Sequence, residues 1–199
     1  MKKWIVVLIV ALVVPNLYAV DLLIGGAYYD GHDNSLWTDG YSGNIQARVP
    51  LAQNLDLGLG LGYVRYNLEG TAGKTGHCRK SSTYATGGNV KAIPVDLSGI
   101  YSIPIGTCKL ELEAGASYNF VTDTDVKTTT KSRRRTTYLD TDLGDFWLCH
   151  LGANVVIPIG MPSIVLGGGY QWDLGRTDFG SNTNNTEGAF CKVGLMLPI

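Results

Sequence analysis

One short stretch decides the fold: residues 55–63 read LDLGLGLGY. Leucine or tyrosine occupies every odd position, and aspartate or glycine occupies every even position. Successive side chains of a β-strand point to opposite faces, so this stretch predicts a strand with one apolar face and one polar or open face. The same alternation recurs along the chain after residue 20.

Eight stretches of this kind can be placed in the sequence, and the connections between them alternate between long and short. The predicted strands are 20–30, 41–51, 55–68, 90–103, 108–120, 143–157, 163–175 and 187–197. The short connections lie near 52–54, 104–107 and 158–162, and the long ones near 31–40, 69–89, 121–142 and 176–186. Pro94 falls inside the fourth strand, where a bulge or a later strand start is expected. The pattern predicts an all-β protein: an eight-stranded antiparallel up-and-down transmembrane β-barrel.

The alternation alone also fits a soluble barrel of the lipocalin kind, in which the apolar face points inward. Three features favour the membrane barrel. The polar face is mostly glycine with sparse charge, the long and short connections alternate strictly, and aromatic residues sit on the apolar face. We expect these aromatic residues to form a girdle near the long-loop ends of the strands. They are Tyr63, Tyr101, Tyr118, Tyr170 and Trp172.

The first 19 residues are predicted to be a secretory signal peptide. Lys2 and Lys3 precede an apolar run over residues 4–14, and Ala19 offers a small residue at the expected cleavage point. The run is shorter than the roughly 20 residues of a spanning helix. Residues 20–199 would then form a single outer-membrane barrel domain. We expect export to the outer membrane of a Gram-negative-type bacterium, with the long loops at the cell surface.

Three segments carry a resemblance to a known family: VPL at 49–51, LDLGLGLGY at 55–63 and LGGGY at 166–170. The chain resembles the small eight-stranded outer-membrane β-barrels. This group includes outer-membrane protein X, the Ail-like adhesins and the porin-family barrel domain of outer-membrane protein A. The resemblance covers essentially all of residues 20–199. It implies insertion by the barrel assembly machinery and contact with outer-membrane lipid and lipopolysaccharide.

The polar faces of the strands place charged residues in the predicted lumen. An eight-stranded barrel is just wide enough for side chains to fill it, and a buried charge is costly unless it is paired. We therefore expect a salt-bridge network with Arg48 and Lys192 among the carboxylates. This network forms a polar plug, or alternatively a narrow ion path or gate. The predicted lumen residues are Arg48, Asp56, Asp96, Lys109, Glu111, Glu113, His150, Asp173 and Lys192.

The third long loop holds a basic run that could contact a polyanion. Arginine suits phosphate and sulfate groups, so lipopolysaccharide phosphates or a sulfated host glycan are candidate ligands. The alternative is a solvated loop whose basic residues are balanced by nearby aspartates. The basic residues are Lys127, Lys131, Arg133, Arg134 and Arg135. The formal net charge of the whole chain is −1, and we expect no nucleic-acid partner.

No catalytic residue, metal ligand or cofactor is predicted. A lipid A-modifying enzyme needs a Ser/His/acid set, and the chain has three histidines. His32, with Asp33 and Ser35, is the nearest such set, and it is typical of a turn. The spacing of Asp30, Asp33 and Asp39 fits no defined calcium loop.

The four cysteines are predicted to be free thiols. Cys149 and Cys191 face outward on strands separated by a third strand, roughly 9–10 Å apart, which exceeds the roughly 7 Å Cα limit of a disulfide. Cys78 and Cys108 fall at opposite ends of the predicted barrel. The function that fits these features is a non-catalytic surface protein whose four long loops bind a partner, mediate adhesion or stabilise the membrane. The alternatives are a small porin-like channel for ions or small solutes and, less favoured, a lipid A-modifying enzyme.

Overall fold

The computed structural model describes residues 20–31, 38–68, 82–132, 135–140, 144–174, 177–179, 182–184 and 187–199. Its regular structure within these ranges consists of β-strands. Within the same ranges no helix is long and apolar enough to cross a membrane. The predicted signal peptide, residues 1–19, lies outside the described residues and stays a prediction.

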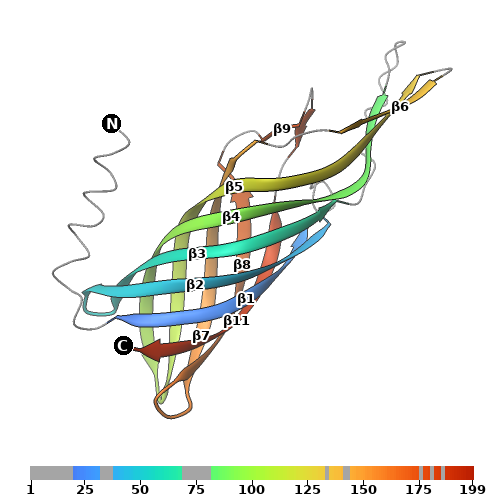
Figure 1. Cartoon of the computed structure of the whole chain (residues 1–199). Helices are drawn as coiled ribbons and strands as arrows, with labels where there is room; N and C mark the ends of the chain where they lie inside the picture. Colours follow the sequence, from blue (N-terminus) through green and yellow to red (C-terminus); the bar gives the residue numbers. More distant parts are fainter. Residues whose placement is uncertain are drawn as a thin grey trace.

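Eight of the described strands close into one antiparallel barrel (Figure 1). Around the ring the order is β4, β3, β2, β1, β11, β8, β7 and β5, and β5 pairs with β4 to close it. The barrel strands are β1 (Asp21–Gly31), β2 (Asp39–Ala52), β3 (Leu55–Leu68), β4 (Ser82–Ile105), β5 (Cys108–Ser132), β7 (Phe146–Pro158), β8 (Ser163–Asp173) and β11 (Gly188–Pro198). Each predicted strand overlaps one of these, so the predicted fold class is confirmed.

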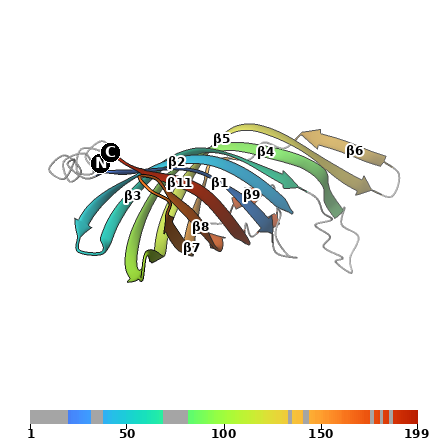
Figure 2. The ribbon, with the colours of Figure 1, turned by 90° about the horizontal axis from the view of Figure 1, so that it is seen from below.

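Three further strands lie in segments predicted to be loops. β6 (Arg135–Asp140) pairs with the far end of β5, and β9 (Thr177–Phe179) pairs with β10 (Asn182–Asn184). β4 and β5 continue past the shorter strands of the barrel, and β5 leads to β6, as Figure 1 and Figure 2 both show. The predictions of loops over 69–89, 121–142 and 176–186 are therefore partly wrong. The missed extension of β5 is rich in threonine, whose branched side chain favours extended backbone.

Pro94 lies inside β4, which begins at Ser82 rather than at the predicted residue 90. A later strand start at this proline is therefore wrong. The expected irregularity does occur: the β3–β4 pairing is interrupted between Ala92 and Val95, and the β4–β5 register shifts between Lys91 and Ala92. Proline has no backbone N–H to donate to the ladder, which explains the gap opposite β3.

The outside of the barrel is a broad apolar surface. Leu61 is 58% exposed, Leu151 is 56% exposed and Val193 is 57% exposed, although all three lie within barrel strands. Water-facing proteins rarely expose so wide an apolar surface, whereas lipid-facing barrels require one. The predicted alternation therefore places the apolar face outward, and this excludes the lipocalin-like alternative.

Four of the five predicted girdle residues lie on the apolar face, toward the long-connection end of the barrel. They are Tyr63, Tyr118, Tyr170 and Trp172. Tyr101 does not, because β4 runs toward a short turn and Tyr101 pairs with Leu55, the first residue of β3. Its predicted position near a long loop is wrong. Further exposed aromatic residues on the long-connection side are Tyr28, Tyr41, Phe120 and Trp147.

The interior contains two apolar clusters. We call the end of the barrel with the turns at 53–54, 106–107 and 159–162 the turn end, and the opposite end the loop end. The loop-end cluster comprises Val64, Tyr66, Val90, Ala92, Phe146 and Leu148. The turn-end cluster comprises Leu23, Val156, Val165 and Met196. Buried polar and charged side chains occupy the lumen between them.

Candidate functional site in the barrel lumen

The centre of the lumen holds a buried ion pair between Arg48 on β2 and Glu111 on β5. Nη1 of Arg48 lies 2.9 Å from both carboxylate oxygens of Glu111, and each residue is 2% exposed. Nε of Arg48 donates to Oε1 of Gln46 at 2.9 Å. Nη1 also contacts Sδ of Met196 in the turn-end cluster, at 3.5 Å. The pair therefore spans the lumen directly above that cluster.

Glu113, two residues further along β5, collects a second set of partners. Its Oε1 accepts from Nε2 of Gln46 at 3.2 Å, and its Oε2 accepts from Nδ2 of Asn154 at 3.0 Å. Nζ of Lys192 forms an ion pair with the same Oε2. Gln46 also donates to Oγ of Ser98 at 3.0 Å. Because Gln46 contacts both Arg48 and Glu113, the two charged groups form one network.

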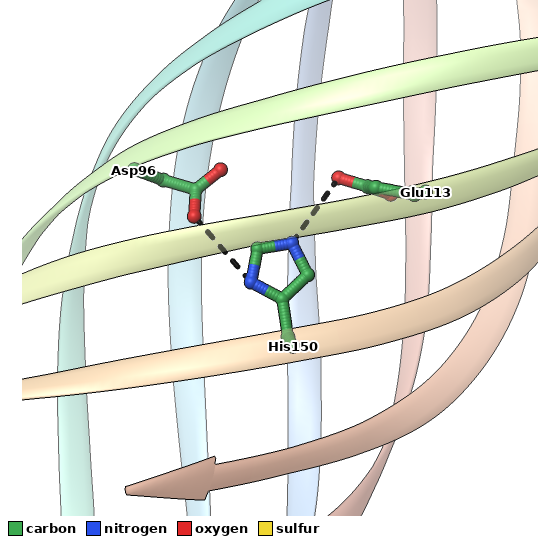
Figure 3. Close-up of side chains that lie close together, drawn as sticks. All are labelled: Asp96, Glu113 and His150. Atoms are coloured by element: carbon green, nitrogen blue, oxygen red, sulfur yellow. Dashed lines mark ion pairs between the residues drawn. The ribbon is translucent and has the colours of Figure 1, made fainter. Parts of the chain in front are cut away.

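His150 on β7 lies between two carboxylates, as Figure 3 shows. Its Nδ1 is 3.6 Å from Oδ1 of Asp96, and its Nε2 is 3.8 Å from Oε1 of Glu113. The ring has room because residue 115 is glycine: a Cβ there would lie 2.6 Å from Cε1 of His150. Among the described residues, one group has carboxylate oxygens and an imidazole nitrogen close enough together to hold a metal ion. It consists of Asp96, Glu113 and His150.

A cavity of about 90 Å³ separates this polar network from the loop-end cluster. Asp96, Glu113, His150 and Lys192 line it from the network, and Tyr66 lines it from the cluster. A water needs roughly 10–15 Å³ of such volume, so the cavity can hold several water molecules. The Arg48 and Glu111 side chains thus meet in the lumen, and space for water lies between the polar network and the loop-end cluster.

The structure brings six of the nine predicted lumen residues together: Arg48, Asp96, Glu111, Glu113, His150 and Lys192. The other three lie near the ends of the barrel. Asp56 and Lys109 are each the second residue of a strand at the turn end, and Lys109 is exposed. Asp173 is the last residue of β8, at the loop end. Lys109 shares its strand parity with Glu111 and Glu113, but it lies at the mouth of the barrel, where solvent reaches its side chain.

Sequence reasoning missed several members of the network. Gln46, Ser98 and Asn154 are buried and connect the charged residues. The two apolar clusters inside the lumen were also missed. Strand parity could have found them, because Gln46 shares its face with Arg48, and Tyr66 shares its face with Gly58 and Gly60. A search restricted to charged residues finds neither the uncharged polar members of the network nor the apolar clusters.

Part of the segment predicted to be a basic loop is β-strand. Lys127 and Lys131 belong to β5 and Arg135 belongs to β6, and the backbone pairs Ser132 with Arg135. Arg133 and Arg134 lie outside the described residues, as do His32, Asp33 and Ser35. A polyanion contact through the basic residues stays a prediction.

The described cysteines are free thiols. Cys108, Cys149 and Cys191 form no disulfide, and Cys78 lies outside the described residues. Cys149 on β7 pairs with Trp172 on β8, whereas Cys191 on β11 pairs with Gly168 on β8. The intervening strand β8 therefore separates the two thiols, as predicted.

The described strands form a closed eight-stranded antiparallel barrel with an apolar exterior, charged residues in its lumen and short turns at one end, and these features define a class of protein. It is the fold of the small outer-membrane β-barrel proteins.

Solved structures of this class resemble the chain over nearly its whole length. Neisserial surface protein A (NspA) has a TM-score of 0.52 and 14% sequence identity, and the alignment covers 90% of this chain and 95% of that one. A major outer membrane protein from Thermus thermophilus has a TM-score of 0.55 and 13% identity, with 92% and 100% coverage. No family model matches the sequence, and no curated protein matches it significantly. The likeness is one of fold.

Proposed function

We propose that the protein is a non-catalytic outer-membrane β-barrel whose lumen is closed, and whose long connections at the cell surface bind partners or stabilise the membrane. The observation that carries the proposal is the buried ion pair of Arg48 and Glu111 across the lumen. An exported barrel of this fold with an apolar exterior fits the outer membrane of a Gram-negative-type bacterium.

The filling of the lumen supports a closed barrel. Eight strands enclose a space just wide enough for side chains. Here the Arg48 and Glu111 side chains meet inside the lumen, and an apolar cluster lies toward each end of the barrel. Hydrated ions would have to displace buried, hydrogen-bonded charges, which is costly.

The outer surface near the loop end supports contact with lipid phosphates. Arg65 on β3 pairs directly with Lys91 on β4, and Tyr41 on β2 pairs with Arg65. Nη1 of Arg65 lies 3.4 Å from the Tyr41 hydroxyl oxygen. Nζ of Lys91 lies 2.6 Å from Oδ2 of Asp123. Arginine and lysine beside an interfacial tyrosine suit the phosphates of lipopolysaccharide.

A small pore is the second candidate, and the cavity of about 90 Å³ favours it. A rearrangement of the Arg48–Glu111 pair would extend this space toward the turn end. The lipid A-modifying enzyme has less support. His150, the described histidine, lies between two carboxylates in the lumen rather than beside a serine at the membrane surface.

Conductance of the refolded full chain in a planar bilayer tests the proposal. A boiled-against-unboiled gel shift first establishes that the protein is folded. The closed barrel predicts no stable conductance steps in the unaltered protein. Glu111→Ala opens part of the lumen, whereas Leu151→Ala on the outer surface is the matched control and should stay silent. The pore would be the correct interpretation if the unaltered protein gave stable conductance steps and these steps changed in Glu111→Ala but not in Leu151→Ala.

A further inference from the structure

Three potential metal ligands converge in the lumen from three neighbouring strands. Asp96 lies on β4, Glu113 on β5 and His150 on β7, and Figure 3 shows the three side chains facing one another. One imidazole nitrogen and one oxygen from each carboxylate all lie within 4.8 Å of one another. The strands β4, β5 and β7 are hydrogen-bonded neighbours, so the backbone holds the three residues in place.

Each imidazole nitrogen faces one of the two carboxylates, at a distance longer than a hydrogen bond. Nδ1 of His150 is 3.6 Å from Asp96, and Nε2 is 3.8 Å from Glu113. Hydrogen bonds between such atoms span roughly 2.7–3.2 Å. Ligands of a tetrahedral zinc ion, with bonds of roughly 2.0–2.2 Å, lie about 3.3–3.6 Å apart. One imidazole nitrogen and one oxygen of each carboxylate lie within 4.8 Å of one another, so the three groups would have to move slightly closer together to share such an ion.

The surroundings supply what a metal site needs beyond its ligands. Gln46 and Asn154 hold the Glu113 carboxylate by hydrogen bonds, and outer-shell partners of this kind orient metal ligands. The three residues border the cavity of about 90 Å³, so water can complete the coordination. A mixed set of one imidazole and two carboxylates suits zinc and its neighbours rather than calcium or magnesium, which prefer oxygen ligands.

The charge of the group also favours a cation. Arg48 and Glu111 neutralise each other, and Lys192 compensates one of the two carboxylates. Asp96 and Glu113 contribute two carboxylates, whereas Lys192 forms its ion pair with Glu113. Lys192 contacts Oε2 of Glu113, which leaves Oε1 facing His150. A cation bound between the two carboxylates would also give Asp96 a positively charged partner, and buried charges are paired or coordinate metals.

We propose that Asp96, Glu113 and His150 bind one divalent transition-metal ion of the zinc type, with water from the cavity as a further ligand. The site belongs to the lumen and is independent of whether the barrel conducts.

Titration of the refolded full chain in detergent tests the site, with Co²⁺ as a spectroscopic probe and Zn²⁺ followed by calorimetry. One ion per chain is expected. Asp96→Asn and His150→Gln each remove one ligand with little change in volume, and each should weaken binding about tenfold or more. Lys192→Met removes the competing ammonium group and should tighten binding.

Two control variants separate the lumen site from other donors. Asp56→Asn changes a carboxylate at the barrel mouth, and the double variant His32→Gln/His77→Gln removes the other two histidines of the chain. Both should bind the ion as the unaltered protein does. Binding that survives both Asp96→Asn and His150→Gln, or the absence of binding to the folded unaltered protein at millimolar Zn²⁺, would overturn the proposal. If one ligand variant does not fold, the other decides.

Discussion

Arg48 of β2 and Glu111 of β5 face each other across the lumen, and one guanidinium nitrogen lies 2.9 Å from both carboxylate oxygens. Two strands, β3 and β4, separate β2 from β5 on the nearer side of the ring. The pair is therefore a contact across the barrel rather than along its wall. It ties together parts of the wall that share no backbone hydrogen bond.

Removing one partner of this pair should destabilise the barrel strongly. Glu111→Gln leaves the Arg48 guanidinium buried without a counter-charge, which typically costs about 3–5 kcal/mol. Replacing both residues, as Arg48→Met with Glu111→Leu, should restore most of the lost stability because no unpaired charge remains. Urea unfolding in lipid vesicles, followed by gel mobility, measures both variants. A double variant less stable than Glu111→Gln would show that the pair contributes more than mutual neutralisation.

Gly115 should tolerate no side chain, because the His150 ring lies over it. A Cβ at residue 115 would be 2.6 Å from Cε1 of His150 and 2.7 Å from the backbone oxygen of Leu97. Gly115→Ala should lower the free energy of unfolding by about 1–3 kcal/mol. Gly99→Ala is the matched control, since its nearest neighbour would be 4.0 Å away. Equal losses in the two variants would contradict the close contact with His150.

Phe146 should contribute far more to stability than Phe120, although both are phenylalanines near the loop end. Phe146 is 4% exposed inside the loop-end cluster, whereas Phe120 is 45% exposed on the outer surface. Phe146→Ala opens a cavity in the lumen and should cost about 3–5 kcal/mol, as large core truncations do. Phe120→Ala should cost clearly less. Unfolding in lipid vesicles compares the two, and a larger loss for Phe120→Ala would place the main packing outside the barrel.

A charge in the middle of the outer surface should oppose membrane insertion. Leu151 lies near the middle of β7 and is 56% exposed. Leu151→Arg should lower stability in a bilayer by about 2–4 kcal/mol. Met161 is 82% exposed in a short turn, so Met161→Arg should have little effect. Refolding yield and urea unfolding in vesicles measure the difference. Equal behaviour of the two arginine variants would mean that Leu151 does not face lipid.

The strands of the barrel can be predicted from local alternation. The predicted strand 55–68, which begins with the stretch at 55–63, coincides with β3, because a strand places alternate residues on opposite faces whatever lies around it. The same parity directs Arg48, Glu111 and His150 inward. Where the sequence does not alternate between apolar and polar residues, the prediction of strands and loops is less accurate. The threonine-rich continuation of β5 forms a strand where a loop is predicted, and Tyr101 lies at the end of the barrel opposite to the predicted one.

The pairing of the lumen side chains depends on closure of the ring. Strand tilt and stagger decide which inward-facing residues lie at the same height along the barrel axis. The local sequence pattern of a single strand predicts neither of them. Arg48 could have met any of several carboxylates, and the closed barrel places it against Glu111. The same closure brings Asp96, Glu113 and His150 together from three strands. Alternation is a property of a single strand, whereas contact across a lumen is a property of eight strands held in one register.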